Sequence, residues 1–217
     1  NKLRDGGFSF GFEPIRVKFS PDAARVKQLE ETGTRFGREL LKIQKRAQRR
    51  SAGGLSESRS DPAVVALGRV LGSLCVLTTR KGDLSGAMVA SWVSQASFTP
   101  PGLTIAVAKD RAIEALMQVG DRFVLNVLRQ DNHQQLMRHF LKRFPPGADR
   151  FAGVNVLEGT ADGGPVLADA LAFLGCRVEQ RMEGPDHWII YAVVEQGNVA
   201  DAEASTAVHH RKVGNHY

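Results

Sequence analysis

The sequence lacks several features that define large classes of proteins. It has only two cysteines in 217 residues, and no apolar run approaches the roughly 20 residues that a membrane-spanning helix needs. The opening from Asn1 does not join a basic stretch to an apolar one, as a signal peptide does. We therefore expect a cytoplasmic protein with no membrane association. The start without methionine indicates a piece of a longer chain.

The two cysteines, Cys75 and Cys176, lie far apart, each inside an apolar run. Such surroundings are typical of reduced core thiols, so we interpret both as core residues rather than redox groups. The last third of the chain is rich in histidine, at His187, His209, His210 and His216. Adjacent side chains on an extended strand point apart, and no carboxylate lies at ligand spacing, so we predict no metal site.

The positive charge of the chain is confined to its beginning. The formal net charge is +6, but residues 1–60 hold 14 Lys and Arg against 7 Asp and Glu, whereas the remainder holds 15 against 16. The densest basic run, residues 42–50, suits a nucleic-acid or membrane-surface patch, or the last turn of a solvated helix, where cations offset the helix dipole. No aromatic or glycine residues interrupt this run for base stacking, so we favour the helix end and predict no nucleic-acid partner.

Residues 1–60 have the pattern of an appendage. Residues 8–12 and 15–19 alternate at period two, which predicts short extended segments, and Ser20 with Pro21 marks a helix start. Apolar side chains then recur at helical spacing, at Val26, Leu29, Phe36, Leu40, Ile43 and Ala47. This stripe has no core of its own, so we expect it to dock on another layer or to project as a poorly packed arm. Residues 51–60 are polar and rich in serine and glycine, as in a flexible linker.

The remainder alternates many strands with short helices. We expect strands at residues 73–79, 84–95, 103–108, 123–128, 170–181 and 187–199, and helices at 63–68, 111–119 and 132–141. A hairpin turn is expected at residues 81–83, and Pro100 with Pro101 is expected to interrupt the ladder. No repeating βαβ rhythm is present, so the pattern favours a mostly antiparallel barrel.

Residues 86–109 carry an unusual number of polar side chains for a region that otherwise reads as two buried strands. Ser91, Ser94, Gln95 and Ser97 lie there among apolar residues. A buried polar group without a partner costs about 1–3 kcal/mol, so these groups must be hydrogen-bonded. Local strand bonds and water are two sources of partners, and a polar planar ligand is a third.

These residues also carry a family resemblance. Residues 86–101, GAMVASWVSQASFTPP, resemble the signature of flavin reductase-like proteins with the FMN-binding split barrel. A small residue and a serine precede an aromatic residue, a second serine-containing triplet follows, and two prolines end the run. Similar residues fall in the family's later positions at 123–128, 149–151, 176–178, 186–187 and 209–212. The resemblance covers residues 61–217 and implies a mostly β fold with short helices, the FMN-binding split barrel.

The beginning of the chain extends this resemblance. Residues 7–21 and the helix after them resemble the last strand and helix of a flavodoxin-like domain, which precedes a flavin reductase module in flavodiiron proteins of oxygenic phototrophs. The implied domains are residues 1–50 as this strand-plus-helix remnant, 51–60 as the linker and 61–217 as the flavin reductase-like split barrel. The diiron domain is missing here, so no iron ligands are carried over.

The resemblance implies FMN as the cofactor, with FAD left open, and NAD(P)H as electron donor. Small residues allow backbone to approach the isoalloxazine ring, an aromatic residue walls the pocket, and cations hold the phosphate. The implied cofactor-binding residues are Val89, Ala90, Ser91, Trp92, Gln95, Ser97, Lys109 and Arg111. The implied catalytic residues, beside the nicotinamide or flavin edge, are His187 and His210. A solvated helix start is the alternative for the two cations, and a surface location is the alternative for the histidines.

We therefore predict an NAD(P)H-dependent flavin reductase module that passes a hydride from reduced nicotinamide to FMN and feeds the diiron oxygen-reducing part of a flavodiiron protein. By resemblance it forms a homodimer with FMN near the interface. Two alternatives stay open. One is a flavin-binding electron relay without a nicotinamide site, since the sequence has no G-x-G-x-x-G fingerprint. The other is a basic interaction module built on residues 21–50.

Overall fold

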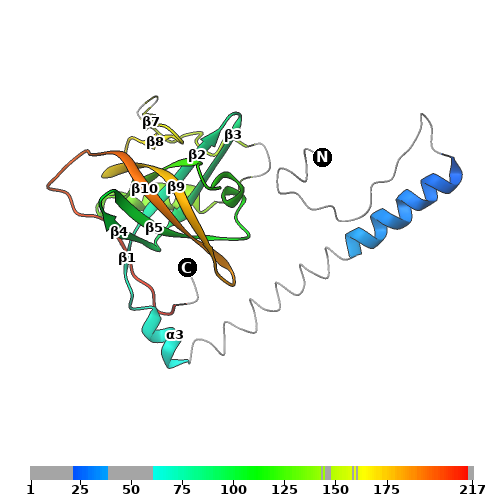
Figure 1. Ribbon diagram of the computed structural model, residues 1–217, viewed down its shortest axis with the longest axis horizontal. Coiled ribbons are helices and arrows are strands. Elements are labelled where there is room, and N and C mark those ends of the chain that lie inside the picture. Colours follow the sequence, from blue (N-terminus) through cyan, green and yellow to red (C-terminus); the bar gives the residue numbers. More distant parts are fainter. Residues whose placement is uncertain are drawn as a thin grey trace. The chain divides into compact units, whose positions relative to one another are not determined.

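The computed structural model describes residues 22–38, 61–142, 144, 148–157, 159 and 161–214. The chain divides into two compact units, one of residues 69–211 and one of residues 1–68 with 212–217 (Figure 1). The extended segments expected at residues 8–19, the cap at Ser20 and Pro21, the basic run at 42–50 and the linker at 51–60 lie outside the described residues.

The smaller unit contains two described helices. Residues 23–38 are helical, and the carboxylate of Asp22 accepts a hydrogen bond from the Arg25 amide at 2.7 Å, which caps the helix start. Within the predicted apolar stripe, the described members Val26, Leu29 and Phe36 are 36–41% exposed. Helix α3 (Pro62–Leu67) is capped in the same way by Asp61, as the Asp-Pro pair predicted.

The larger unit is built on a seven-stranded antiparallel sheet in the order β3-β2-β6-β9-β10-β5-β4. Its strands are β2 (Cys75–Lys81), β3 (Leu84–Ala90), β4 (Val93–Phe98), β5 (Pro101–Ala108), β6 (Arg122–Val127), β9 (Ala172–Glu183) and β10 (His187–Val199). Two small ribbons pair β1 (Gly72–Ser73) with β11 (Val208–His209), and β7 (Val156–Leu157) with β8 (Val166–Leu167). Two short helices, the 3-10 helix η1 (Ala112–Leu116) and α4 (His133–Phe140), complete the unit.

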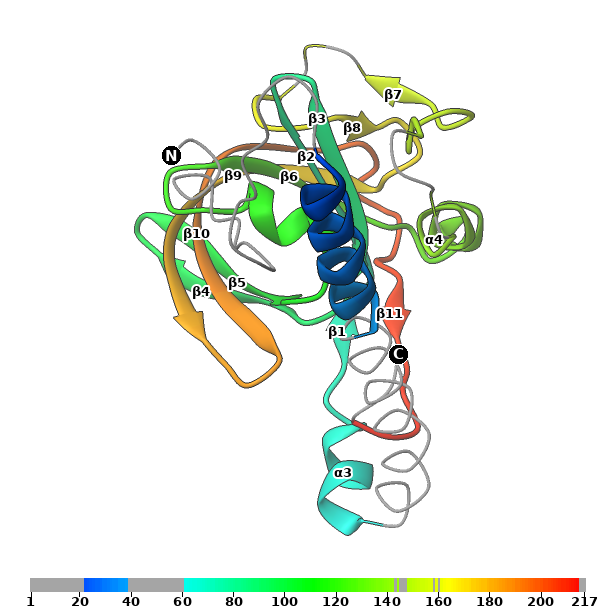
Figure 2. The same cartoon turned by 90° about the vertical axis from the view of Figure 1, so that its right-hand side faces the viewer.

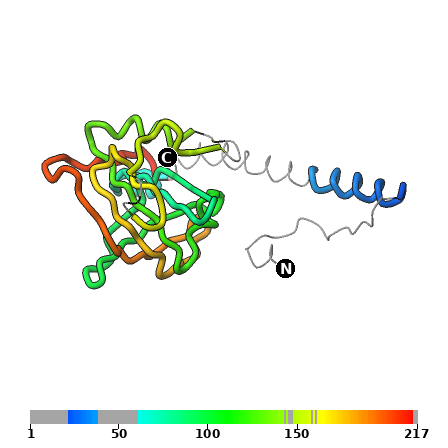
Figure 3. The backbone as a smooth tube through the Cα atoms, turned by 90° about the horizontal axis from the view of Figure 1, so that it is seen from above, coloured from blue at the N-terminus to red at the C-terminus, as the bar shows by residue number. Residues whose placement is uncertain are grey.

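The sheet curls into a barrel, and Figures 2 and 3 show its strands wrapped around one centre. Alternation along β2 divides its side chains between two cores. Leu77 lies inside the barrel, whereas Val76 lies on the outer face, in the core that includes Leu136 and Phe140 of α4. The predicted fold class, a mostly β split barrel with short helices, is confirmed.

Both cysteines are in the barrel core. Cys75 and Cys176 are each 1% exposed and carry free thiols. Removal from water disfavours the thiolate and raises the pKa of each to about 12. The interpretation of both as reduced core residues is confirmed.

Asn126 is a buried polar side chain that connects the sheet to its outer layer. It is fully buried in β6. Its amide nitrogen donates to the Val76 carbonyl and to the Thr78 hydroxyl, both at 3.2 Å, and its amide oxygen accepts from the Leu167 amide at 2.8 Å. One side chain therefore ties β6 to β2 and to β8 with its polar atoms satisfied.

The predicted strand at residues 84–95 is wrong, because the chain changes partner strands in the middle of it. Ala90 still pairs with Cys75 of β2, but Val93 already pairs with Ile105 of β5. The two residues between them, Ser91 and Trp92, belong to no strand. Strands β3 and β4 are thus the two edges of the sheet, and no ladder joins them within the described residues. We call this connection, Ser91 and Trp92, the seam; the Trp92 carbonyl accepts a hydrogen bond from the Ala106 amide of β5 at 3.0 Å.

Two further expectations need correction. The helix expected at 111–119 is only the 3-10 helix η1, since the amides of Glu114 and Met117 each bond three residues back. Pro100 lies in the turn between β4 and β5, as expected, but Pro101 does not interrupt the ladder, because it is the first residue of β5 and pairs with Phe98. The hairpin turn at 81–83, the helix near 132–141 and the two long C-terminal strands are confirmed to within a few residues.

Candidate functional site

Three side chains from distant parts of the sequence stack at the seam. The half-buried Trp92 ring lies 4.8 Å, centroid to centroid, from the imidazole of His187, with the two planes tilted by 39°. The Arg211 guanidinium carbon lies 5.1 Å from the Trp92 centroid. Cation–ring contacts of this kind contribute about 0.5–1 kcal/mol at exposed sites. The seam therefore carries the Trp92 ring, with the His187 imidazole and the Arg211 guanidinium packed against it.

The backbone at Ser91 is fixed by the β1–β11 ribbon. The Ser91 side chain is buried, and its hydroxyl oxygen lies 3.1 Å from Nδ1 of His209. Gly72, which pairs with His209, approaches so closely that a Cβ there would lie 1.8 Å from the Ser91 carbonyl oxygen. Burial first, and then the charges of Arg211 and His210, lower the pKa of His209.

His187 is held in place at the start of β10. Its Nδ1 lies 2.8 Å from a carboxylate oxygen of Asp186, and its side chain is 12% exposed. The hydrogen bond to His187 is the main cause of the lowered pKa of the Asp186 carboxyl. The Lys109 amide donates to the Asp186 carbonyl at 3.0 Å, so the end of β5 lies next to this histidine. The structure thus brings His187 to the Trp92 ring and places its neighbour Asp186 against the backbone of Lys109.

The two predicted phosphate-binding cations both lie just beyond β5. The Lys109 ammonium is 2.7 Å from Glu183, and this contact lowers the pKa of the Glu183 carboxyl. Arg111 has its Nε 3.9 Å from the Asp110 carboxylate, and its side chain is 57% exposed. Exposed pairs of this kind contribute only about 0–1 kcal/mol, so an anion can exchange with the carboxylates at little cost.

Ser97 lies elsewhere on the sheet. Its hydroxyl donates to the Pro100 carbonyl at 2.7 Å and lies 2.9 Å from the Tyr191 hydroxyl. Ser97 pairs with Gly102, at the far end of β5 from Lys109, which is about 20 Å along a strand. The structure therefore does not bring Ser97 to the two cations. Gln95 is exposed, and its amide donates to the Ser97 carbonyl at 3.4 Å.

The remaining predicted residues flank the seam or lie on the surface. Ala90 is 3% exposed and lines the barrel core, whereas Val89 is half-buried against the outer core. His210 is exposed, and its neighbours His209 and Arg211 are the residues that contact the seam. Sequence reasoning named His209 together with His210 at the nicotinamide or flavin edge, and it missed Arg211 as a site residue. The spacing of two between His209 and Arg211 in an extended segment, which puts both on one side, was the available signal.

The described residues show no group of three or more His, Cys, Asp or Glu side chains placed to hold a metal ion. Among the same residues, no helix is long and apolar enough to cross a lipid bilayer. Two open hollows of about 250 and 310 Å³ lie at the other end of β2, around Arg80 and Asp162. They are separate from the seam, which lies beside Cys75.

Comparison with known proteins places this chain in a family. The family described as "Flavin reductase like domain" matches residues 67–215. The chain therefore belongs to the flavin reductase-like family, and flavin is the cofactor class of that family. It is 54% identical, over its whole length, to diflavin flavoprotein A 1 of Synechocystis, and it spans 36% of the length of that relative. The predicted resemblance to this family and to the longer flavodiiron proteins is confirmed.

Solved structures of similar fold agree. The NADH:FAD oxidoreductase SgcE6 of Streptomyces globisporus is 27% identical, with a TM-score of 0.61, over 66% of this chain and 84% of that one. The same protein in complex with NAD and FAD fragments matches at 26% identity and a TM-score of 0.59, again over 66% and 84%. These similarities support an oxidoreductase-type module.

Proposed function

We propose that this chain is an NAD(P)H:flavin oxidoreductase module that uses FMN at the seam. The observation that carries the proposal is the stacking of His187 and Arg211 on Trp92 at the seam, with the Lys109 amide bonded to the carbonyl of Asp186 beside His187. A connection between two strands that are not paired with each other can present an aromatic ring and charged groups to a ligand without loss of strand hydrogen bonds. Family membership and the similarity to an NADH:FAD oxidoreductase support this assignment.

The chemistry of the donor set fits a flavin. A flavin has a planar ring with a polar edge and, in FMN, an anionic tail. The seam offers a buried serine backbone beside a tryptophan, and the end of β5 offers an ammonium and a guanidinium. Bound there, the flavin would supply the two-electron chemistry by accepting a hydride from reduced nicotinamide.

The chain's own residues bind and orient in this proposal. Lys109 and Arg111 hold the phosphate, and the backbone of Ala90 and Ser91 approaches the ring. His187, fixed by Asp186, borders the nicotinamide together with His210. Alignment of the nicotinamide carbon with the flavin N5 would account for the catalysis, because hydride transfer needs little acid–base chemistry from the protein.

In the longer relatives, this module accompanies other domains. We propose that residues 1–50 are the end of a flavodoxin-like domain, that 51–60 link it to the split barrel, and that the module delivers electrons to a diiron part. The module acts as a homodimer with FMN near the subunit interface. These proposals rest on the diflavin names and greater lengths of the relatives.

An anaerobic titration tests the proposal. The purified chain is loaded with FMN, NADPH or NADH is added without oxygen, and the absorbance of oxidised flavin is followed. Bleaching supports the reductase, whereas bound flavin that fails to bleach supports an electron relay without a nicotinamide site. We expect Lys109→Ala to reduce FMN retention. The Ser97 hydroxyl already has two protein partners, the Pro100 carbonyl and the Tyr191 hydroxyl. Unchanged FMN retention in Ser97→Ala would show that this residue is not part of the site.

A further inference from the structure

A buried cation lies inside the barrel mouth and contacts the helix that follows the proposed phosphate-binding segment. Arg181 of β9 has a side chain only 9% exposed, and it pairs in register with Ile190 of the barrel core. Its guanidinium donates to the carboxylate of Glu114 in η1. Its Nε is buried and has no hydrogen-bond partner among the described residues. A buried charge held by one carboxylate is expensive to maintain, so this contact needs an explanation.

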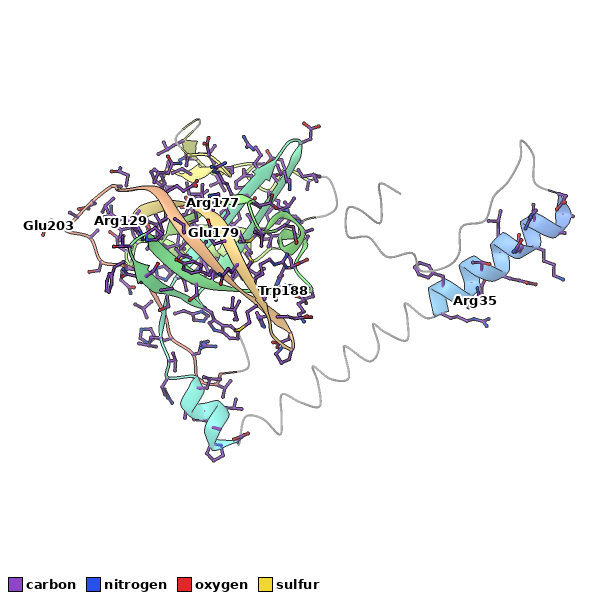
Figure 4. All side chains as sticks on the ribbon, in the orientation of Figure 1. Arg35, Arg129, Arg177, Glu179, Trp188 and Glu203 are labelled. Carbon is purple, nitrogen blue, oxygen red and sulfur yellow. The ribbon has the colours of Figure 1, made fainter. Side chains whose placement is uncertain are left out.

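The same cation stacks on a tryptophan that also faces Lys109. The Arg181 guanidinium carbon lies 4.2 Å from the Trp188 ring centroid, and the Lys109 ammonium lies 5.4 Å from it. Figure 4 labels Trp188 close to the free end of the β9–β10 hairpin. Trp188 packs against the barrel core, whereas the preceding His187 stacks on Trp92. Side chains of neighbouring strand residues point to opposite faces of a sheet. Trp188 therefore contacts Lys109 and the barrel core, whereas His187 contacts Trp92 of the seam.

Helix η1 depends on such a tether. It is a five-residue 3-10 helix, and Arg111, its first flanking residue, makes no side-chain capping bond. Short helices of this kind have poor hydrogen-bond geometry and little stability of their own. Ile113 and Met117 fix the apolar side of this segment in the barrel core. Glu114 fixes its polar side through Arg181.

We propose that Arg181 is a positioning residue that, through Glu114, holds η1 and the preceding segment from Lys109 to Arg111 in the arrangement that receives the flavin phosphate. This inference rests on the proposed function. Arg181 touches neither the flavin nor the nicotinamide in this proposal. Its loss therefore weakens binding of a flavin with a phosphate and spares binding of a flavin without one.

Comparison of FMN with riboflavin, which lacks the phosphate, tests this proposal. Dissociation constants for both are measured with the full chain and with Arg181→Met, which keeps apolar length over Trp188 but removes the charge. Glu114→Met removes the same contact from the helix side with a side chain of similar length, which keeps the test open if Arg181→Met fails to fold. Arg177→Met is the matched control, because Arg177 lies on the same strand but bonds to Glu195 and Glu179.

We expect each of the first two variants to bind FMN about tenfold more weakly, which is about 1.4 kcal/mol, with riboflavin affinity changed less than about twofold. The double variant should bind FMN no more weakly than the weaker-binding single variant, since both substitutions remove the same contact between Arg181 and Glu114. Arg177→Met should match the wild-type chain. Equal losses for FMN and riboflavin would show a merely structural role, and unchanged FMN affinity would also overturn the inference. A wild-type chain that binds neither flavin overturns the proposed function itself.

Discussion

The hydroxyl of Ser91 and Nδ1 of His209 lie 3.1 Å apart, although the two residues are separated by 118 positions in the sequence. This contact joins the seam to the β1–β11 ribbon, and it places a titratable ring in a partly buried position beside Arg211 and His210. The contact between the ribbon and the seam therefore depends on the protonation of His209, and so on pH.

The lowered pKa of His209 predicts a loss of stability in mild acid. The folded protein takes up the proton less readily than the unfolded chain, whose histidine titrates near 6.5, so stability falls as the pH drops below that value. We expect the midpoint of urea unfolding to fall between pH 7.5 and 5.5, and His209→Asn to lose less over that interval. The carboxyls with lowered pKa, Asp131, Glu183, Asp186 and Glu195, act only at lower pH. Identical pH dependence in the two proteins would contradict this prediction.

Gly72→Ala should disrupt the ribbon. A methyl group at this position would meet the Ser91 carbonyl oxygen at 1.8 Å, which backbone movement alone can relieve. We expect a loss of about 1–3 kcal/mol in the free energy of unfolding, measured by urea denaturation. Gly33→Ala is the control, since nothing lies within 4 Å of a Cβ there and the position is helical. A Gly72→Ala protein as stable as the wild type would refute the close approach.

Asn126→Leu should cost about 2–4 kcal/mol of stability, because it leaves the buried Leu167 amide without its acceptor and removes both bonds to β2. Chemical denaturation followed by tryptophan fluorescence measures this loss. For comparison, Asn132→Ala removes one exposed bond to the Asp169 carbonyl and should change stability by less than about 1 kcal/mol. Similar losses in the two variants would mean that the Asn126 network contributes little.

The thiols of Cys75 and Cys176 should be unreactive in the native protein. Each has a pKa of about 12 and is 1% exposed, so little thiolate is available at pH 8. We expect a thiol reagent such as 5,5′-dithiobis(2-nitrobenzoic acid) to label neither cysteine within minutes in buffer and both in denaturant. Rapid native labelling of one cysteine would show that its part of the barrel opens easily.

Much of the fold could be predicted from local patterns. Alternation and turn signals located the long strands, the Asp61 cap and the hairpin at Gly82, because these depend on neighbouring residues. The change of partner strands at Ser91 could not be predicted in this way, since its cause is pairing with β2 on one side and β5 on the other. Long-range register has no local signature.

The site was predicted in part for the same reason. Trp92 and His187 were both singled out, and they stack on each other. Ser97 was grouped with Lys109 because both lie near the polar stretch, yet strand β5 separates them. The role of Arg181 gave no sequence signal, because an arginine near the end of a strand is usually solvated.

The seam has a mechanical consequence. Every other neighbouring pair of strands in the seven-stranded sheet is joined by backbone amide-to-carbonyl hydrogen bonds. Strands β3 and β4 are instead connected by the covalent chain through Ser91 and Trp92. The barrel wall therefore has one junction at which two neighbouring strands are not paired with each other. In the proposed function, a flavin bound at this junction would displace side-chain contacts and leave the strand ladders intact.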